Sequence, residues 1–162
     1  MITNPRLSFG DRFKNIDLAI SFLETYKINI IKKSSFYETF SYPNKNNPKF
    51  INSVIAVKTK LSPVDLMSVL IFVEEKLERK RSKKNDPRTC DLDIIDYNYQ
   101  IMNFKYQDLE LTLPHKEMSN RNFVLYPLRE ICPNWIHPLT KKNINVLIKD
   151  LKTSNNEITK LS

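Results

Sequence analysis

Two aspartates separated by one residue, Asp91 and Asp93, are the strongest local indication of chemistry in this sequence. They lie within a stretch, residues 89–97, whose alternation of apolar and polar side chains predicts a strand. On a strand, side chains at positions i and i+2 point to the same face, about 7 Å apart, which leaves Leu92 and Ile94 facing the core. Paired carboxylates of this kind suit Mg²⁺, a hard ion that takes oxygen ligands together with substrate phosphates. A strand face whose acids are merely solvated is the alternative interpretation.

Basic residues precede the aspartate pair. Arg88 stands three residues before Asp91, and a basic run covers residues 79–84. Such a run can be a solvated helix end or a nucleic-acid patch. Cations beside a carboxylate pair are also what phosphoryl transfer requires, because charge on the moving group must be neutralised. The stretch therefore favours a magnesium–nucleotide site in a small phosphoryl-transfer enzyme.

Composition limits how a nucleotide could be held. The net charge of +8 suits nucleic acid, an anionic membrane surface or a phosphorylated small molecule. Gly10 is the only glycine, which excludes a Walker loop and a Rossmann fingerprint, so side chains and metal must hold the phosphates. No apolar run reaches the roughly 20 residues that cross a bilayer, and no signal peptide is evident. We expect a cytoplasmic protein in which Cys90 and Cys132 are free thiols.

The elements that must position these residues follow from periodicity and capping signals. Ser62 and Pro63 are typical of a helix start. We expect helices at 11–26, 63–79, 124–131 and 144–151, strands at 28–37, 50–59 and 89–97, a hairpin at 100–104 and 109–113, and a loop at 41–49. This order predicts one α+β domain over residues 1–162, with a sheet covered mainly on one side.

A second polar cluster spans residues 113–123 and contains His115. A histidine that follows proline in a polar loop is more often a hydrogen-bonded structural residue than a catalyst. His137 and Trp135 have no obvious chemical neighbours in the sequence, and we expect both to be structural.

Five ordered segments together resemble the 6-hydroxymethyl-7,8-dihydropterin pyrophosphokinase (HPPK) family. They are Pro87–Ile94, similar to the family's PRTLDLDI signature, Pro114–Leu128 with its spaced His, Met, Arg and Phe, Ser34–Thr39, Phe50–Asn52, and Glu74 with Arg79 and Arg81. The resemblance implies transfer of the diphosphate of ATP to the hydroxymethyl group of the pterin, releasing AMP, in folate biosynthesis. It also implies a monomeric ferredoxin-like α/β sandwich with extra C-terminal elements, acting on small molecules and on no nucleic acid or membrane.

The resemblance assigns expected roles to individual residues. Arg81 and Arg88 would be catalytic and neutralise the diphosphate. Asp91 and Asp93 would bind two Mg²⁺ ions. ATP would be bound by Glu74, Arg79, Ile94, Thr112, His115 and Arg121. The pterin would be bound by Thr39, Phe50, Asn52 and Phe123.

Two departures from the family pattern matter. Asn85-Asp86 stands where the family has a tryptophan before its Pro-Arg pair, and Thr3-Asn4-Pro5 matches only the end of the family's first strand. A truncated first strand would leave backbone groups of its neighbours unpaired, so we expect the true start to lie upstream of Met1. The alternatives are a catalytically impaired relative and a basic nucleic-acid-binding module. The segment Phe50–Val57 lacks the aromatic pattern with which RNA-binding sheets stack bases.

Overall fold

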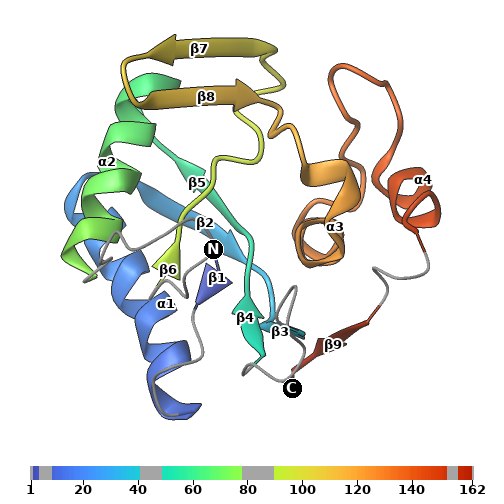
Figure 1. Ribbon diagram of the computed structural model, residues 1–162, viewed down its shortest axis with the longest axis horizontal. Coiled ribbons are helices and arrows are strands. Elements are labelled where there is room, and N and C mark those ends of the chain that lie inside the picture. The colour runs from blue at the N-terminus through green and yellow to red at the C-terminus, as the bar shows by residue number, and fades with distance from the viewer. Residues whose placement is uncertain (1, 4–8, 41–48, 78–89, 153–156, 162) are drawn as a thin grey trace.

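The computed structural model describes residues 2–3, 9–40, 49–77, 90–152 and 157–161 (Figure 1). The catalytic arginines expected from the sequence, Arg81 and Arg88, and also Arg79, fall outside these ranges. The elements in chain order are β1 (Ile2–Thr3), α1 (Phe9–Thr25), β2 (Asn29–Lys33), β3 (Tyr37–Thr39), β4 (Phe50–Asn52), β5 (Ile55–Lys58), α2 (Pro63–Lys76), β6 (Cys90–Asp91), β7 (Met102–Tyr106), β8 (Leu109–Leu113), the 3₁₀ turn η1 (Met118–Asn120), α3 (Asn122–Ile131), α4 (Ile144–Lys149) and β9 (Ile158–Lys160).

The strands form one larger sheet and two pairs. The order in the larger sheet is β6-β1-β4-β3-β9, and β2–β5 and β7–β8 are separate two-stranded pairs. All pairings are antiparallel. The fold is therefore α+β with antiparallel sheets, as expected from the order of elements.

The two long strands expected at 28–37 and 50–59 are each divided in two. Serine side chains lie at the break: the Ser34 and Ser53 hydroxyls are 3.1 Å apart, and the Val54 N–H donates to Ser34 Oγ at 3.0 Å. The serine hydroxyls bond to backbone groups that, in continuous strands, would hydrogen-bond to the neighbouring strand. The prediction of two uninterrupted strands was wrong for this reason.

Strand assignment around the aspartates also differs from the prediction. Of the expected strand at 89–97 the structure describes residues 90–97, and within these only Cys90–Asp91 is a strand, paired with Thr3 and Ile2 of β1. Strand β9, which pairs with β3, has no counterpart among the expected elements. Helix α2 begins as predicted, with Ser62 Oγ accepting from the Asp65 N–H and Pro63 in its first turn.

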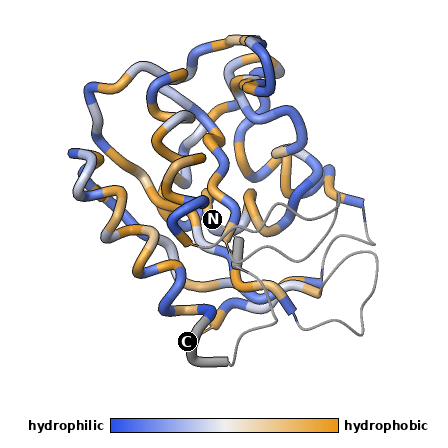
Figure 2. Tube along the Cα trace, turned by 60° about the vertical axis from the view of Figure 1, so that its left-hand side comes forward, coloured by the Kyte–Doolittle hydropathy of each residue, from blue (hydrophilic) through white to orange (hydrophobic). Residues whose placement is uncertain are grey.

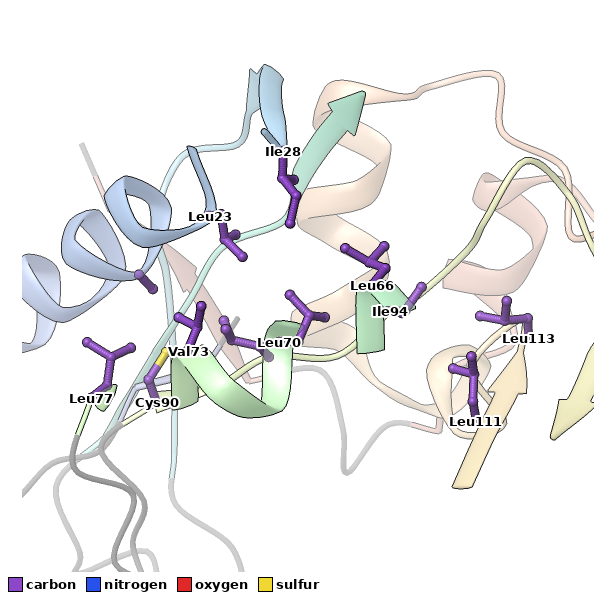
Figure 3. Close-up of a cluster of buried hydrophobic side chains, with 12 residues drawn as sticks. Leu23, Ile28, Leu66, Leu70, Val73, Leu77, Cys90, Ile94, Leu111 and Leu113 are labelled. Atoms are coloured by element: carbon purple, nitrogen blue, oxygen red, sulfur yellow. The ribbon is translucent and has the colours of Figure 1, made fainter. Parts of the chain in front are cut away.

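Two apolar cores lie against the sheets. The first core joins α1 and α2 to residues 90–94 and to β8, and Figure 3 shows its side chains. The second core joins α3 and α4 and contains Trp135, as expected for a packing residue. Along the chain, hydrophobic residues alternate with hydrophilic ones at short intervals, as amphipathic elements require (Figure 2). Among the described helices, none is both long and apolar enough to span a membrane.

Candidate functional site

The sheet register brings two predicted site residues close together. Ile2 of β1 pairs with Asn52 on one side and with Asp91 on the other. Because neighbouring strands lie about 4.8 Å apart, the Cα atoms of Asn52 and Asp91 are about 10 Å apart. Directly opposed residues in an antiparallel sheet also point to the same face. A residue expected to bind the pterin and one expected to bind metal therefore share one face of the sheet.

The alternation predicted around the aspartates is present. Cys90, Leu92 and Ile94 are buried in the first core, whereas Asp91 is half-buried and Asp93 is exposed. The backbone between the aspartates is anchored by Glu74 of α2, whose carboxylate accepts a hydrogen bond of 2.7 Å from the Leu92 N–H. Glu74 is only 5% exposed. Its carboxylate thus holds the segment that presents both aspartates, in addition to the role in ATP binding expected from the sequence.

Asp93 meets a cation from the other polar cluster. Arg121, at the start of α3, places Nη1 3.5 Å from Asp93 Oδ2. Both side chains are about one-third exposed, so the pair is weak by itself and open to exchange with other charged groups. The Arg121 guanidinium also lies 5.7 Å from the centre of the Phe123 ring. Three residues expected to bind metal, ATP and pterin are therefore neighbours.

His115 belongs to the same group. Its backbone N–H donates to the Ile95 carbonyl at 2.9 Å, which ties it to the segment that follows Asp93. Burial lowers the pKa of His115 below its usual range, although the carboxylate of Asp93 opposes this effect. The Glu117 N–H donates to His115 Nδ1 at 3.2 Å, so Nδ1 is an acceptor and the neutral ring carries its proton on Nε2. The side chain is therefore a neutral hydrogen-bond donor beside Asp93 and Arg121.

Asn52 is the most confined polar side chain of the site. It is 2% exposed, and its Nδ2 donates to the Tyr37 carbonyl and to Thr39 Oγ1, both at 3.1 Å. A carbonyl can only accept, so the orientation of the amide is fixed by its neighbours. Its Oδ1 accepts no hydrogen bond from the described residues. A buried acceptor that receives no hydrogen bond costs free energy, so Asn52 Oδ1 is suited to accept one from a donor such as an N–H of a ligand.

Phe50 and Thr39 complete this part of the site. They pair across β3 and β4, and Phe50 is half-buried. Phe123 at the start of α3 is also half-buried, so aromatic surface is available from two elements. Aromatic faces of this kind suit a flat heterocycle.

Two other residues expected to contact ATP differ from each other in how deeply their side chains are buried. The side chain of Ile94 is buried in the first core, so only its backbone is open to a ligand. Thr112 is half-buried on β8, beside the buried Leu111 and Leu113. His137 is structural, as expected: its Nδ1 accepts from the N–H groups of Leu139 and Thr140.

One residue that was not expected from the sequence links the two halves of the site. Glu130 of α3 accepts hydrogen bonds from the Tyr37 hydroxyl at 2.7 Å and from Ser35 Oγ and N–H at 2.8 and 3.0 Å. Lys160 of β9 approaches it at 3.4 Å. These contacts fix α3, which carries Phe123, against β3, which carries Thr39. An isolated glutamate late in a helix gives no sequence signal for such a role.

The described part of the chain offers few metal ligands at this site. Among the described residues, no group of three or more His, Cys, Asp or Glu side chains could hold a metal ion. Two carboxylates fit an ion that takes its remaining oxygen ligands from substrate phosphates and water. The Arg121 guanidinium at Asp93 already shows that this carboxylate takes a cation as its neighbour.

Comparison with known proteins points to one family. The model of the 7,8-dihydro-6-hydroxymethylpterin-pyrophosphokinase (HPPK) family matches residues 7–133. A 2-amino-4-hydroxy-6-hydroxymethyldihydropteridine pyrophosphokinase of Aquifex aeolicus is 36% identical over 146 residues, covering 90% of this chain and 86% of the relative. The protein of that name from Synechocystis is 36% identical over 124 residues, covering 76% and 61%. The folic acid synthesis protein fol1 of Schizosaccharomyces pombe is 32% identical over 145 residues. This chain spans 19% of the fol1 length and 61% of the Synechocystis protein.

Proposed function

Because the chain belongs to the 7,8-dihydro-6-hydroxymethylpterin-pyrophosphokinase (HPPK) family, we propose that it transfers the β,γ-diphosphate of ATP to the hydroxymethyl group of 6-hydroxymethyl-7,8-dihydropterin in folate biosynthesis. The observation that supports this most is the pairing of Ile2 with both Asn52 and Asp91. The pairing places Asn52 and Asp91 on one face of the sheet, where they would serve as a buried acceptor for a pterin N–H and as a carboxylate ligand of a metal–triphosphate. The family match does not favour a nucleic-acid-binding module.

The proposed reaction is a displacement at phosphorus. The hydroxymethyl oxygen attacks the β-phosphorus of ATP, the bond from that phosphorus to the bridging oxygen of the α-phosphate breaks, and AMP leaves with that oxygen. The alcohol gives up its proton to water. Such a reaction needs positioning and charge compensation more than covalent participation by the protein.

The residues of this chain would supply both the positioning and the charge compensation. Asn52 Oδ1 would accept from a ring N–H of the pterin, and the Phe50 and Phe123 rings would cover its faces. His115 would donate from Nε2 to a phosphate oxygen. Arg121 would move from Asp93 to a phosphate when a metal ion takes its place. Arg81 and Arg88 keep their predicted role of neutralising the diphosphate, and Arg79 keeps its predicted role in binding ATP.

Asp91 and Asp93 would hold two Mg²⁺ ions together with the triphosphate. When bound, these ions neutralise phosphate charge and make the β-phosphorus easier to attack. Their fit rests on two carboxylates that alternate with buried residues and on the cation already beside Asp93. Glu74 fixes the backbone between them, so that the two carboxylates keep one relative position.

We also propose the finer fold: a ferredoxin-like α/β sandwich in which β1 is the first strand. The strand order β6-β1-β4-β3 and the two helices α1 and α2 support it. The β7–β8 hairpin, α3, α4 and β9 would be the extra C-terminal elements. A single domain over residues 1–162, a monomeric state and a cytoplasmic location stay predictions from the sequence.

The activity is tested by incubating the protein with Mg²⁺, ATP and 6-hydroxymethyl-7,8-dihydropterin and measuring AMP by chromatography. We expect AMP to form only when the pterin is present. Asp93→Asn should lower the rate about 100-fold or more, because a metal and phosphate site loses its charge. Asp108→Asn, an exposed aspartate in the β7–β8 turn, is the matched control and should leave the rate unchanged.

Folded protein that makes no AMP would refute the proposed activity and favour a catalytically impaired relative. Equal AMP production by the Asp93→Asn variant and the control would refute the assigned metal site while leaving the activity in place.

A further inference from the structure

Glu130 stands at an unfavourable position in its own helix. It is the penultimate residue of α3, where the carbonyl ends of the helix repel negative charge. Its carboxylate nevertheless collects donors from another part of the chain: the Tyr37 hydroxyl at 2.7 Å, and the Ser35 hydroxyl and N–H at 2.8 and 3.0 Å. The helix gains nothing from a carboxylate at this position, so the contacts across the fold are what the side chain serves.

Tyr37 connects Glu130 to the part of the site that is expected to bind the pterin. The Tyr37 hydroxyl donates to Glu130 Oε2, and the Tyr37 carbonyl accepts from Asn52 Nδ2 at 3.1 Å. Tyr37 and Asn52 are direct partners across β3 and β4, so their side chains point to the same face of the sheet. Tyr37 is 7% and Asn52 2% exposed, which leaves neither side chain room to move alone. A displacement of Tyr37 would therefore also displace the Asn52 amide.

Glu130 and Phe123 lie on the same side of α3. Seven positions separate them, which is nearly two full turns and about 10 Å along the helix axis. The anchoring of Glu130 to Tyr37 therefore sets how far the Phe123 ring stands from the sheet. Because the Asn52 amide is bonded to the same Tyr37, one hydrogen bond controls the position of the ring relative to the amide.

We propose that Glu130 is a positioning residue for pterin binding: through its hydrogen bond with the Tyr37 hydroxyl, it holds the Phe123 ring and the Asn52 amide at the separation that a flat heterocycle requires. The ring would cover a face of the heterocycle while the amide accepts at its edge. Groups that are held in place before binding lose less freedom when the ligand arrives, so they bind it more tightly. This inference rests on the proposed function.

The groups expected to bind metal and ATP are held by other contacts. The backbone beside Asp93 is anchored by the hydrogen bond from the Leu92 N–H to Glu74, and His115 is tied to the Ile95 carbonyl. Glu130 takes part in neither contact. A change at Glu130 should therefore affect the binding of the pterin and leave the binding of ATP nearly unchanged.

The test compares Tyr37→Phe, Glu130→Ala and the double variant with the parent protein in the AMP assay. Tyr37→Phe removes only the hydroxyl and keeps the carbonyl to which Asn52 is bonded. We expect each single change to raise KM for 6-hydroxymethyl-7,8-dihydropterin about fivefold, the effect of one hydrogen bond, and to leave KM for ATP within about twofold. The double variant should differ from Glu130→Ala by less than about twofold, because both changes remove the same hydrogen bond.

Ile28→Val is the matched control for a loss of stability. Ile28 is 1% exposed and belongs to the first core, whereas α3 belongs to the second. Loss of one buried methyl group should lower Tm by about 2–4 °C. Both KM values of this variant should stay within about twofold of the parent values.

The Asn52 side chain reports on the same coupling without substrates. Its Nδ2 group donates to the Tyr37 carbonyl and to Thr39 Oγ1, which protects it from exchange with water. Hydrogen exchange of this side-chain amide, followed by NMR, should be about fivefold faster in Tyr37→Phe than in the parent protein or in Ile28→Val.

Equal increases in KM for the pterin and for ATP would overturn the positioning role, as would a pterin KM that stays within about twofold of the parent value in Tyr37→Phe. The same rise in pterin KM in Ile28→Val, or unchanged exchange of the Asn52 amide in Tyr37→Phe, would overturn it too. Tyr37→Phe decides the outcome if Glu130→Ala does not fold. Absence of AMP from the folded parent protein would refute the proposed function instead, and the exchange of the Asn52 amide would still test the link between Tyr37 and Asn52.

Discussion

Removal of the Glu130 charge should destabilise the protein in a way that depends on pH. Burial by itself would raise the pKa of Glu130, but hydrogen bonds from Tyr37 and Ser35 outweigh it and lower the pKa to about 2. A depression from the ordinary 4.5 corresponds to about 3 kcal/mol of folding free energy as an upper bound. The side chain is 27% exposed, so solvent screening reduces this to about 2 kcal/mol.

The direction of this pH dependence follows because the folded state favours the ionised form of Glu130. The contribution of Glu130 is fully present above pH 4.5, the ordinary value, and is lost as the pH falls toward 2. Glu130→Gln should therefore be about 2 kcal/mol less stable than the parent protein at pH 7, and the difference should shrink by nearly half at pH 3.5.

Urea unfolding at pH 7 and at pH 3.5, followed by circular dichroism, measures this difference. Glu75→Gln is the control, because Glu75 is an exposed glutamate at the end of α2, and it should change stability by less than about 0.5 kcal/mol. A Glu130→Gln difference below about 0.5 kcal/mol at pH 7 would show that the Tyr37 and Ser35 contacts do not stabilise α3 against β3. A difference that is the same at both pH values would show that the carboxylate charge is not involved.

Three further outcomes follow from the structure. Asn52→Ala should raise KM for the pterin about tenfold or more in the AMP assay and leave KM for ATP nearly unchanged, because it removes a buried acceptor; equal effects on both substrates would contradict this. Burial raises the pKa of Cys90 to about 12, so a thiol reagent at pH 8 should modify the half-buried Cys132 first and Cys90 only on unfolding, as mass spectrometry of the labelled protein can show. Burial lowers the pKa of His137 and Asp96 opposes it, so Asp96→Asn should lower the pKa further in an NMR titration, and an increase would be inconsistent with the packing around His137.

Local features of the site could be predicted from the sequence. The alternation of Asp91 and Asp93 with Leu92 and Ile94 gives the correct inward and outward directions even where the strand itself is short. The start of α2 at Pro63 follows from Ser62 and its hydrogen bond to the Asp65 N–H. These features depend on contacts within a few residues, so local sequence is sufficient to specify them.

The strand boundaries could not be predicted in the same way. The serine hydroxyls that interrupt β2–β3 and β4–β5 act across a pair of strands, and Ser34 and Ser53 are 19 residues apart in the chain. Strand β6 is a strand where Cys90 and Asp91 pair with Thr3 and Ile2 of β1. Strand length is decided by the neighbour in the sheet, and periodicity along one segment does not contain that information.

By itself, the sequence determined the residue types of this site: a carboxylate pair, a histidine, arginines, an asparagine and aromatic rings, with no glycine-rich phosphate loop. Only the tertiary structure decided that Asn52 and Asp91 flank Ile2, that Arg121 meets Asp93, and that Glu130 joins α3 to Tyr37. The physical reason is that sheet register and helix packing minimise the free energy of the whole chain. Contacts between residues tens of positions apart are therefore set by the free-energy minimum of the whole chain, and a local sequence pattern does not specify them.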